Sequence, residues 1–253
     1  YSFTGATPFV QALLSVKYTL AENADAETPL TTWVATDGAV SLYRNDHVLP
    51  LGFMVPAGAS SWNHLDTNPI QVQNNFVAST TSVGSIFTMV NTGNGSSCSF
   101  TAPQDGYYYV VLTDFSVKNI TAAFGETSTT YNNVDRDFIL DLGYMKNGEE
   151  VTLTGDDNKS LSVSFYRLLQ DEFIDAIDQL NEEPLRVDSY SDTKIQGRVT
   201  ALSDGILFTS IPYEEGWTVY VDGGVDVTVS GSAVLETTGF KGAVRLDGSD
   251  SRP

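Results

Sequence analysis

Residues 97–113, SCSFTAPQDGYYYVVLT, hold two strand patterns separated by the turn Gln104-Asp105-Gly106. The same alternation of strand and turn continues through residues 86–166. We predict strands there at 87–90, 97–101, 107–113, 120–124, 136–142, 150–154 and 160–166. Asn147-Gly148 is a strong tight-turn signal within this region. Short strands at this spacing predict a β-sandwich or jelly roll.

One amphipathic helix follows the strands. Within residues 171–180, Phe173, Ile177 and Leu180 fall on a single face and acidic side chains on the other. Residues 1–90 combine short strands with two helices, whose N-caps are Thr7 and Asn68. We predict a mainly β protein with some α (α+β). Its parts are a mixed α/β N-terminal part at 1–90, a β-sandwich-like region at 91–183 ending in the helix, and a C-terminal β region at 184–253.

The C-terminal β region contains residues 210–223, SIPYEEGWTVYVDG, which predict a hairpin. Pro212 fixes φ at the start of the turn, and Gly216 can adopt the positive φ that closes it. From Trp217 to Val221 apolar residues alternate with Thr218 and Tyr220, so one strand face is apolar. This pattern specifies a hairpin and no chemistry.

Composition indicates a folded, acidic protein. Apolar residues make up 41% of the 253 residues and aromatic residues 11%, which excludes a disordered chain. The formal charge of −19 argues against nucleic acid or an anionic lipid surface as a direct partner. No apolar run is long enough to cross a membrane, and Tyr1 starts no signal peptide, so we expect a piece of a longer protein. Cys98, the only cysteine, is predicted to fill the core.

Few residues form a pattern that carries chemistry. His47 and His64 have no spacing that joins them to other zinc ligands, and no nucleophile elbow, phosphate-binding loop or dinucleotide fingerprint is present. We therefore predict no catalytic residue, no metal and no cofactor. Asp135, Asp137 and Asp141 could together bind calcium, but the solvent face of a strand is the favoured interpretation.

Aromatic side chains are the candidate binding residues. Tyr107 and Tyr109 share one face of a predicted strand, and that face could stack on sugar rings. Tyr213 and Trp217, in the predicted hairpin, are further candidates. The alternative, which is commoner for these residue types, is that the rings pack in the core.

Four segments agree in type and order with one protein family. They are Leu13-Leu14-Ser15-Val16-Lys17-Tyr18, with Ser15 in place of the usual glycine; Tyr43-Arg44-Asn45-Asp46-His47-Val48-Leu49-Pro50-Leu51-Gly52-Phe53; Ile195-Gln196-Gly197-Arg198-Val199; and residues 210–223. Together they resemble the YfhO family of bacterial membrane proteins. The resemblance covers nearly the whole chain and weakens after Gly224.

The resemblance implies a parent protein of known general type. Members of the family are large polytopic proteins regarded as GT-C-like glycosyltransferases, which transfer sugar from a lipid-phosphate carrier onto envelope polymers such as teichoic acids. This chain resembles their soluble extracytoplasmic region, so no catalytic residue carries over to it. We expect it at the extracytoplasmic face of the bacterial cell membrane. Its expected partners are its own transmembrane helices and an envelope glycan or lipid-linked sugar.

Three roles remain open for the chain itself. It could recognise the acceptor or shape access to a membrane-embedded catalytic site while catalysing nothing. It could be a carbohydrate-binding β-sandwich module, or a purely structural interaction domain. A visible site, rather than the family resemblance, has to decide among these roles.

Overall fold

The computed structural model describes residues 7–22, 28–62, 66–114, 116–135, 139–202, 204–211, 217–221, 234–237 and 241–248. The chain forms two compact units, each assembled from separate segments. The first contains residues 1–9, 63–77 and 83–173, and the second residues 10–62, 78–82 and 174–253. The division predicted at residues 90 and 183 follows sequence order, whereas these units do not.

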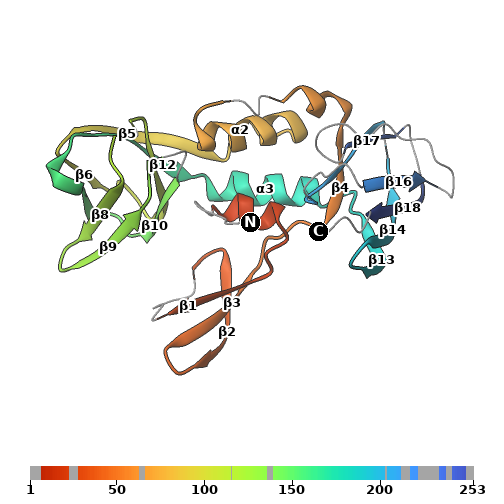
Figure 1. Cartoon of the computed structure of the whole chain (residues 1–253), viewed down its shortest axis with the longest axis horizontal. Helices are drawn as coiled ribbons and strands as arrows, with labels where there is room; N and C mark the ends of the chain where they lie inside the picture. Colours follow the sequence, from red (N-terminus) through yellow and green to blue (C-terminus); the bar gives the residue numbers. More distant parts are fainter. Residues whose placement is uncertain are drawn as a thin grey trace, which may run out of the picture. The chain divides into compact units, whose positions relative to one another are not determined.

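The first unit contains two four-stranded antiparallel sheets, drawn from yellow to green in Figure 1. One sheet has the order β10-β7-β12-β5, and the other β6-β11-β8-β9. The strands are β5 (Phe87–Gly95), β6 (Ser97–Thr101), β7 (Gly106–Leu112), β8 (Asn119–Phe124), β9 (Thr127–Asn132), β10 (Ile139–Met145), β11 (Glu150–Gly155) and β12 (Leu161–Leu168); the short 3-10 helix η2 (Asp156–Asn158) follows β11. The predicted mainly β fold is confirmed.

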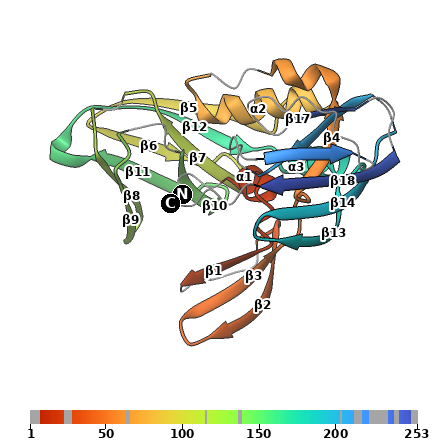
Figure 2. The same cartoon turned by 45° about the vertical axis from the view of Figure 1, so that its right-hand side comes forward.

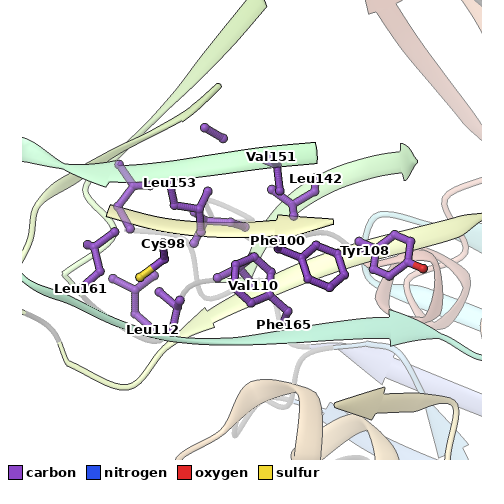
Figure 3. Packing of buried hydrophobic residues seen from close by; sticks show 14 of the residues in the cluster. Cys98, Phe100, Tyr108, Val110, Leu112, Leu142, Val151, Leu153, Leu161 and Phe165 are labelled. Atoms are coloured by element: carbon purple, nitrogen blue, oxygen red, sulfur yellow. The ribbon is translucent and has the colours of Figure 1, made fainter. Parts of the chain in front are cut away.

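A hydrophobic core shared by the two sheets holds them together. Tyr108, Val110 and Leu112 of β7 alternate inward and pack in one cluster with Cys98 and Phe100 of β6. Figure 3 shows this packing, with the sulfur of Cys98 (yellow) among the aliphatic side chains and the aromatic rings beside it. The rings of Phe100 and Phe165 stack at 4.7 Å between their centroids. Two sheets that share one core in this way form a sandwich, and Cys98 fills the core as predicted.

Helix α2 (Pro69–Thr80) begins at the predicted N-cap. The Asn68 side-chain oxygen accepts hydrogen bonds from the amides of Ile70 (2.9 Å) and Gln71 (3.3 Å). Further along the helix, the buried Asn74 side chain accepts from the Ile86 and Phe87 amides and donates to the Phe87 carbonyl. This side chain therefore attaches the helix to the start of β5.

The second unit contains two three-stranded sheets, of orders β1-β3-β2 and β17-β15-β4, and a four-stranded sheet of order β13-β14-β18-β16. The first of these is drawn in red to orange in Figure 2. A second core contains Met54, Val199, Leu207 and Val219, from four different strands. The strands are β1 (Tyr18–Glu22), β2 (Thr31–Asp37), β3 (Val40–Asn45), β4 (Gly52–Pro56), β13 (Arg186–Ser191), β14 (Lys194–Thr200), β15 (Gly205–Thr209), β16 (Trp217–Val221), β17 (Val234–Thr237) and β18 (Lys241–Gly248).

The remaining helices are short. Helix α1 (Pro8–Leu13) starts with the predicted proline, and α3 (Gln170–Leu180) matches the predicted amphipathic helix. A 3-10 helix, η1 (Ala57–Ser61), follows β4. Phe173, Ala176, Ile177 and Leu180 form the buried face of α3. None of the helices in the described part of the chain has the length and apolar character that a membrane crossing requires.

The predicted hairpin at residues 210–223 is wrong in its pairing. β15 pairs with β4 on one side and with β17 on the other, while β16 pairs with β18 in a different sheet. The reason is that both edges of β15 are already occupied, so β16 has no free edge of β15 to join. The turn residues 212–216 lie outside the described residues.

Candidate functional site

The structure places the predicted aromatic candidates in different environments. Tyr107 and Tyr109 are buried, and the ring of Tyr109 meets Phe87 edge-on at 5.5 Å between centroids. Burial raises the pKa of the Tyr109 hydroxyl well above its ordinary value. Tyr213 lies outside the described residues, and for Trp217 only the backbone, in β16, is described. A role for these four residues in stacking on sugar rings stays a prediction.

A polar pocket lies in the second unit, and no pattern in the sequence analysis singled it out. Its volume is about 320 Å³, within the usual range for small-ligand sites. It forms where α2 and α3 both end, beside the start of β15 and the end of β4. The lining residues are Met54, Val55 and Pro56 of β4; Thr80, Thr81 and Ser82 at the end of α2; Gln179, Glu182 and Glu183 at the end of α3; and Gly205 of β15.

A hydrogen-bonded clamp between Ser82 and Gln179 shapes the pocket. The Ser82 amide donates to the Gln179 side-chain oxygen at 2.9 Å, and the Gln179 side-chain nitrogen lies 3.0 Å from the Ser82 hydroxyl oxygen. The same nitrogen donates to a carboxylate oxygen of Asp175 at 3.1 Å. These bonds hold the two helix ends together and present hydroxyl and amide groups beside each other.

The segment after α3 fixes the other wall. The Met54 amide donates to the Glu183 carbonyl at 3.0 Å, and the Leu185 amide donates to the Gly52 carbonyl at 2.7 Å, so this segment runs along β4. The Glu183 carboxylate accepts a hydrogen bond from the Leu202 amide at 2.9 Å. Both the carbonyl and the carboxylate of Glu183 are therefore held by hydrogen bonds. Glu182, by contrast, is an exposed residue at the edge of the pocket.

Gly205 allows β15 to approach β4 at the pocket. A side chain added at Gly205 would place its Cβ only 2.5 Å from the Val55 carbonyl oxygen. Because the clashing atom belongs to the backbone of β4, a side chain at this position would force the two paired strands to shift, which favours glycine. The pocket wall and the sheet register thus depend on the same residue.

The chemistry of the pocket suits a hydroxylated ligand. Carboxylates, amides and hydroxyls are the side chains that exchange hydrogen bonds with sugar or polyol hydroxyls, and Met54 and Pro56 add apolar surface for carbon-bound hydrogens. Within the described ranges, no group of His, Cys, Asp and Glu side chains is arranged to hold a metal ion. In the sequence, the only signals were polar runs after two helices, Thr80-Thr81-Ser82 and Glu182-Glu183, which also occur in ordinary loops.

The comparisons with known proteins concern the chain as a whole. No curated protein sequence matches it. Among solved structures, the A223 C-terminal domain, a structural protein from Sulfolobus turreted icosahedral virus, is similar at 22% identity over 33% of this chain and 99% of that one. With a TM-score of 0.25, this similarity carries no argument. The family described as bacterial membrane protein YfhO matches residues 1–100 and 89–229, so most of the chain is covered. The chain belongs to the YfhO family of bacterial membrane proteins.

Proposed function

We propose that this chain is the extracytoplasmic domain of a membrane glycosyltransferase, that it catalyses nothing by itself, and that it recognises the glycan acceptor. The acceptor would be a cell-envelope polymer of the teichoic acid type, and the sugar would come from a lipid carrier. Membership in a family of membrane proteins supports the cellular context. The polar pocket at the ends of α2 and α3 is the observation that carries the proposal.

The pocket fits recognition better than catalysis. Glycoside hydrolysis typically uses two carboxyl groups on opposite sides of the reacting bond. Glu182 and Glu183 are adjacent in sequence, and the Glu183 carboxylate is held by the Leu202 amide. By contrast, Ser82 and Gln179 are prearranged by their mutual hydrogen bonds, and preorganised polar groups lower the entropic cost of binding a ligand.

The test uses the intact membrane-bound protein. Gln179→Ala removes the clamp and one wall of the pocket, and Gln196→Ala, at an exposed position of β14, is the matched control. We expect Gln179→Ala to reduce sugar incorporation into the envelope polymer about tenfold, at unchanged protein level in the membrane, and the control to leave it unchanged. Full incorporation with the Gln179 variant would contradict the proposal, as would sugar transfer by the isolated chain.

A second role, packing against the protein's own transmembrane helices, is favoured by the sheet β1-β3-β2. Leu20 is 73% exposed and Tyr18 50% exposed. The strand register pairs Leu20 with Leu42, so all three side chains share one sheet face. Exposed apolar faces of this kind are typical of interaction sites. Photocrosslinking from position 20 in the intact protein tests this role. We expect a crosslink to one of the protein's own membrane helices, and the absence of any such crosslink would contradict this role.

A further inference from the structure

The pocket at the ends of α2 and α3 has a one-sided charge. None of the described residues that line it is basic, whereas Glu182 and Glu183 are acidic. Neither α2 nor α3 has a basic residue in its last turn. The C-terminal end of a helix carries partial negative charge, which basic residues in the last turn usually offset. Two such ends and two carboxylates therefore meet at one cavity without a compensating cation from its lining.

This charge decides which ligands the cavity can hold. A phosphate or carboxylate group has the same sign of charge as Glu182 and the two helix ends, so they would repel it. The lining contains no basic residue that would offset this repulsion. A neutral hydroxyl can bind by donating to a carboxylate or to the Gln179 side-chain oxygen. A protonated amine can do the same with three N–H donors and gains electrostatic attraction in addition.

We infer that the pocket selects a protonated amino group carried on a hydroxylated skeleton, such as a non-acetylated amino sugar, and rejects phosphate. The ammonium group would lie against the Glu182 carboxylate, and neighbouring hydroxyls would bond Gln179 and Ser82. This inference rests on the proposed function, since it specifies the part of the acceptor that the pocket recognises. The phosphate groups of an acceptor polymer or lipid carrier would then lie outside the pocket.

The experiment compares four small probes on the whole chain at about pH 6, where a primary amine is protonated. The probes are glucosamine, N-acetylglucosamine, glucose and glucose 6-phosphate. The first two differ chiefly in the charge of one nitrogen. Binding is followed by two-dimensional amide NMR, in which the Ser82 amide, hydrogen-bonded to Gln179, reports on the pocket directly.

We expect glucosamine to bind about five- to tenfold more tightly than N-acetylglucosamine, as one partly exposed charge interaction at a helix end implies. Glucose 6-phosphate should bind more weakly than glucose. The preference for glucosamine should decrease as salt is added, because exposed charge interactions are screened.

Matched variants locate the effect. Glu182→Gln keeps the shape of the side chain and removes the charge, so it should abolish the preference for glucosamine over N-acetylglucosamine. Glu126→Gln, in the exposed turn between β8 and β9, changes the net charge equally and should preserve the preference.

The outcomes separate the two proposals. Equal affinity for glucosamine, N-acetylglucosamine and glucose at the Ser82 amide would overturn the charge inference while leaving glycan recognition by the pocket intact. If none of the four probes changes the chemical shift of the Ser82 amide, both the charge inference and the proposed glycan recognition by the pocket are overturned. Tighter binding of glucose 6-phosphate than of glucose would also contradict the inference.

Discussion

Ser15 has a backbone φ of 57°, in the left-handed region that glycine adopts without strain. It replaces the glycine of the family pattern, and its hydroxyl donates to the Leu49 carbonyl at 2.9 Å. The Asn45 side chain donates to the Val16 carbonyl at 2.5 Å. The first two resemblance segments therefore bond to each other. Gly197, in the third segment, lies so close to Arg186 that an added Cβ would be 2.5 Å from its carbonyl oxygen. At the residue scale, the family pattern specifies backbone geometry rather than chemistry.

Substitutions at Ser15 test this interpretation. Ser15→Ala keeps the strained φ and loses the hydrogen bond, so we expect a loss of about 1 kcal/mol in the free energy of unfolding. Ser15→Gly loses the same bond but removes about 1 kcal/mol of backbone strain, so it should be close to neutral. Urea unfolding of both variants measures the difference. Equal destabilisation by alanine and glycine would show that the backbone at this position is not strained.

At the scale of elements, the sequence predicted those strands and helices that have a clear apolar pattern. Helix α3, helix α2 with its Asn68 cap, and the strands of the sandwich core follow from periodicity and turn residues. β9 (Thr127–Asn132) was not among the predicted strands, because its side chains are mostly exposed and are mostly threonine and other polar residues. The pairing of β15 and β16 could not be predicted, since it depends on partners far away in sequence.

Asn74 connects two elements and should be intolerant of change. Asn74→Leu leaves the Ile86 and Phe87 amides and the Phe87 carbonyl without their partner in a buried setting. We expect a loss of about 3 kcal/mol in the free energy of unfolding, from several buried unsatisfied groups. Asn132→Leu, at an exposed position of β9, is the control. Chemical denaturation gives both free energies of unfolding. A loss below about 1 kcal/mol for Asn74→Leu would contradict the role of Asn74 in attaching α2 to the start of β5.

Asp141 lies at a bulge of β10, where the register to β7 shifts. Desolvation by its neighbours raises the pKa of its carboxyl to about 6, although the Gly143 amide donates to it and favours the charged form. The folded state therefore holds this proton more tightly than the unfolded state does. Its contribution to stability is fully present below about pH 4 and is lost as the pH rises through about 6.

Asp141→Asn should remove that dependence. Relative to the unsubstituted chain, the variant should have a higher melting temperature at pH 7 and a similar one at pH 4. Contact of Asp141 with solvent moderates the size of the effect. Asp105→Asn should act in the opposite direction at pH 7, because the Asn147 amide and Lys146 hold the pKa of Asp105 below its ordinary value. The melting temperatures of the three proteins at pH 4 and pH 7 test both expectations. An Asp141→Asn variant that melts no higher than the unsubstituted chain at pH 7 would contradict the first.

At the scale of the whole molecule, the fold class and the family could be predicted from the sequence, whereas the pocket could not. The sequence was sufficient for the mainly β fold class and for the family, because both depend on many residues. The pocket was not predictable, since its lining comes from β4, α2, α3 and β15, which only the fold brings together. No single stretch of the chain carries its signal.

The net charge of −19 itself gives a prediction. Like charges repel more strongly in the compact state, and added salt screens them. We expect the melting temperature to rise between about 10 mM and about 150 mM sodium chloride, over which the screening length falls from about 30 Å to about 8 Å. Sodium sulfate at equal ionic strength controls for ion-specific effects. A melting temperature that falls with both salts would show that attractive ion pairs dominate instead.

The most direct test of the account is to map where an envelope oligosaccharide contacts this chain, by amide NMR titration of all assigned signals. The account predicts chemical-shift changes at Ser82, Gln179 and Glu182, with none in the sandwich strands around Tyr107 and Tyr109. Shifts confined to those sandwich strands, or no shifts at saturating ligand, would contradict it.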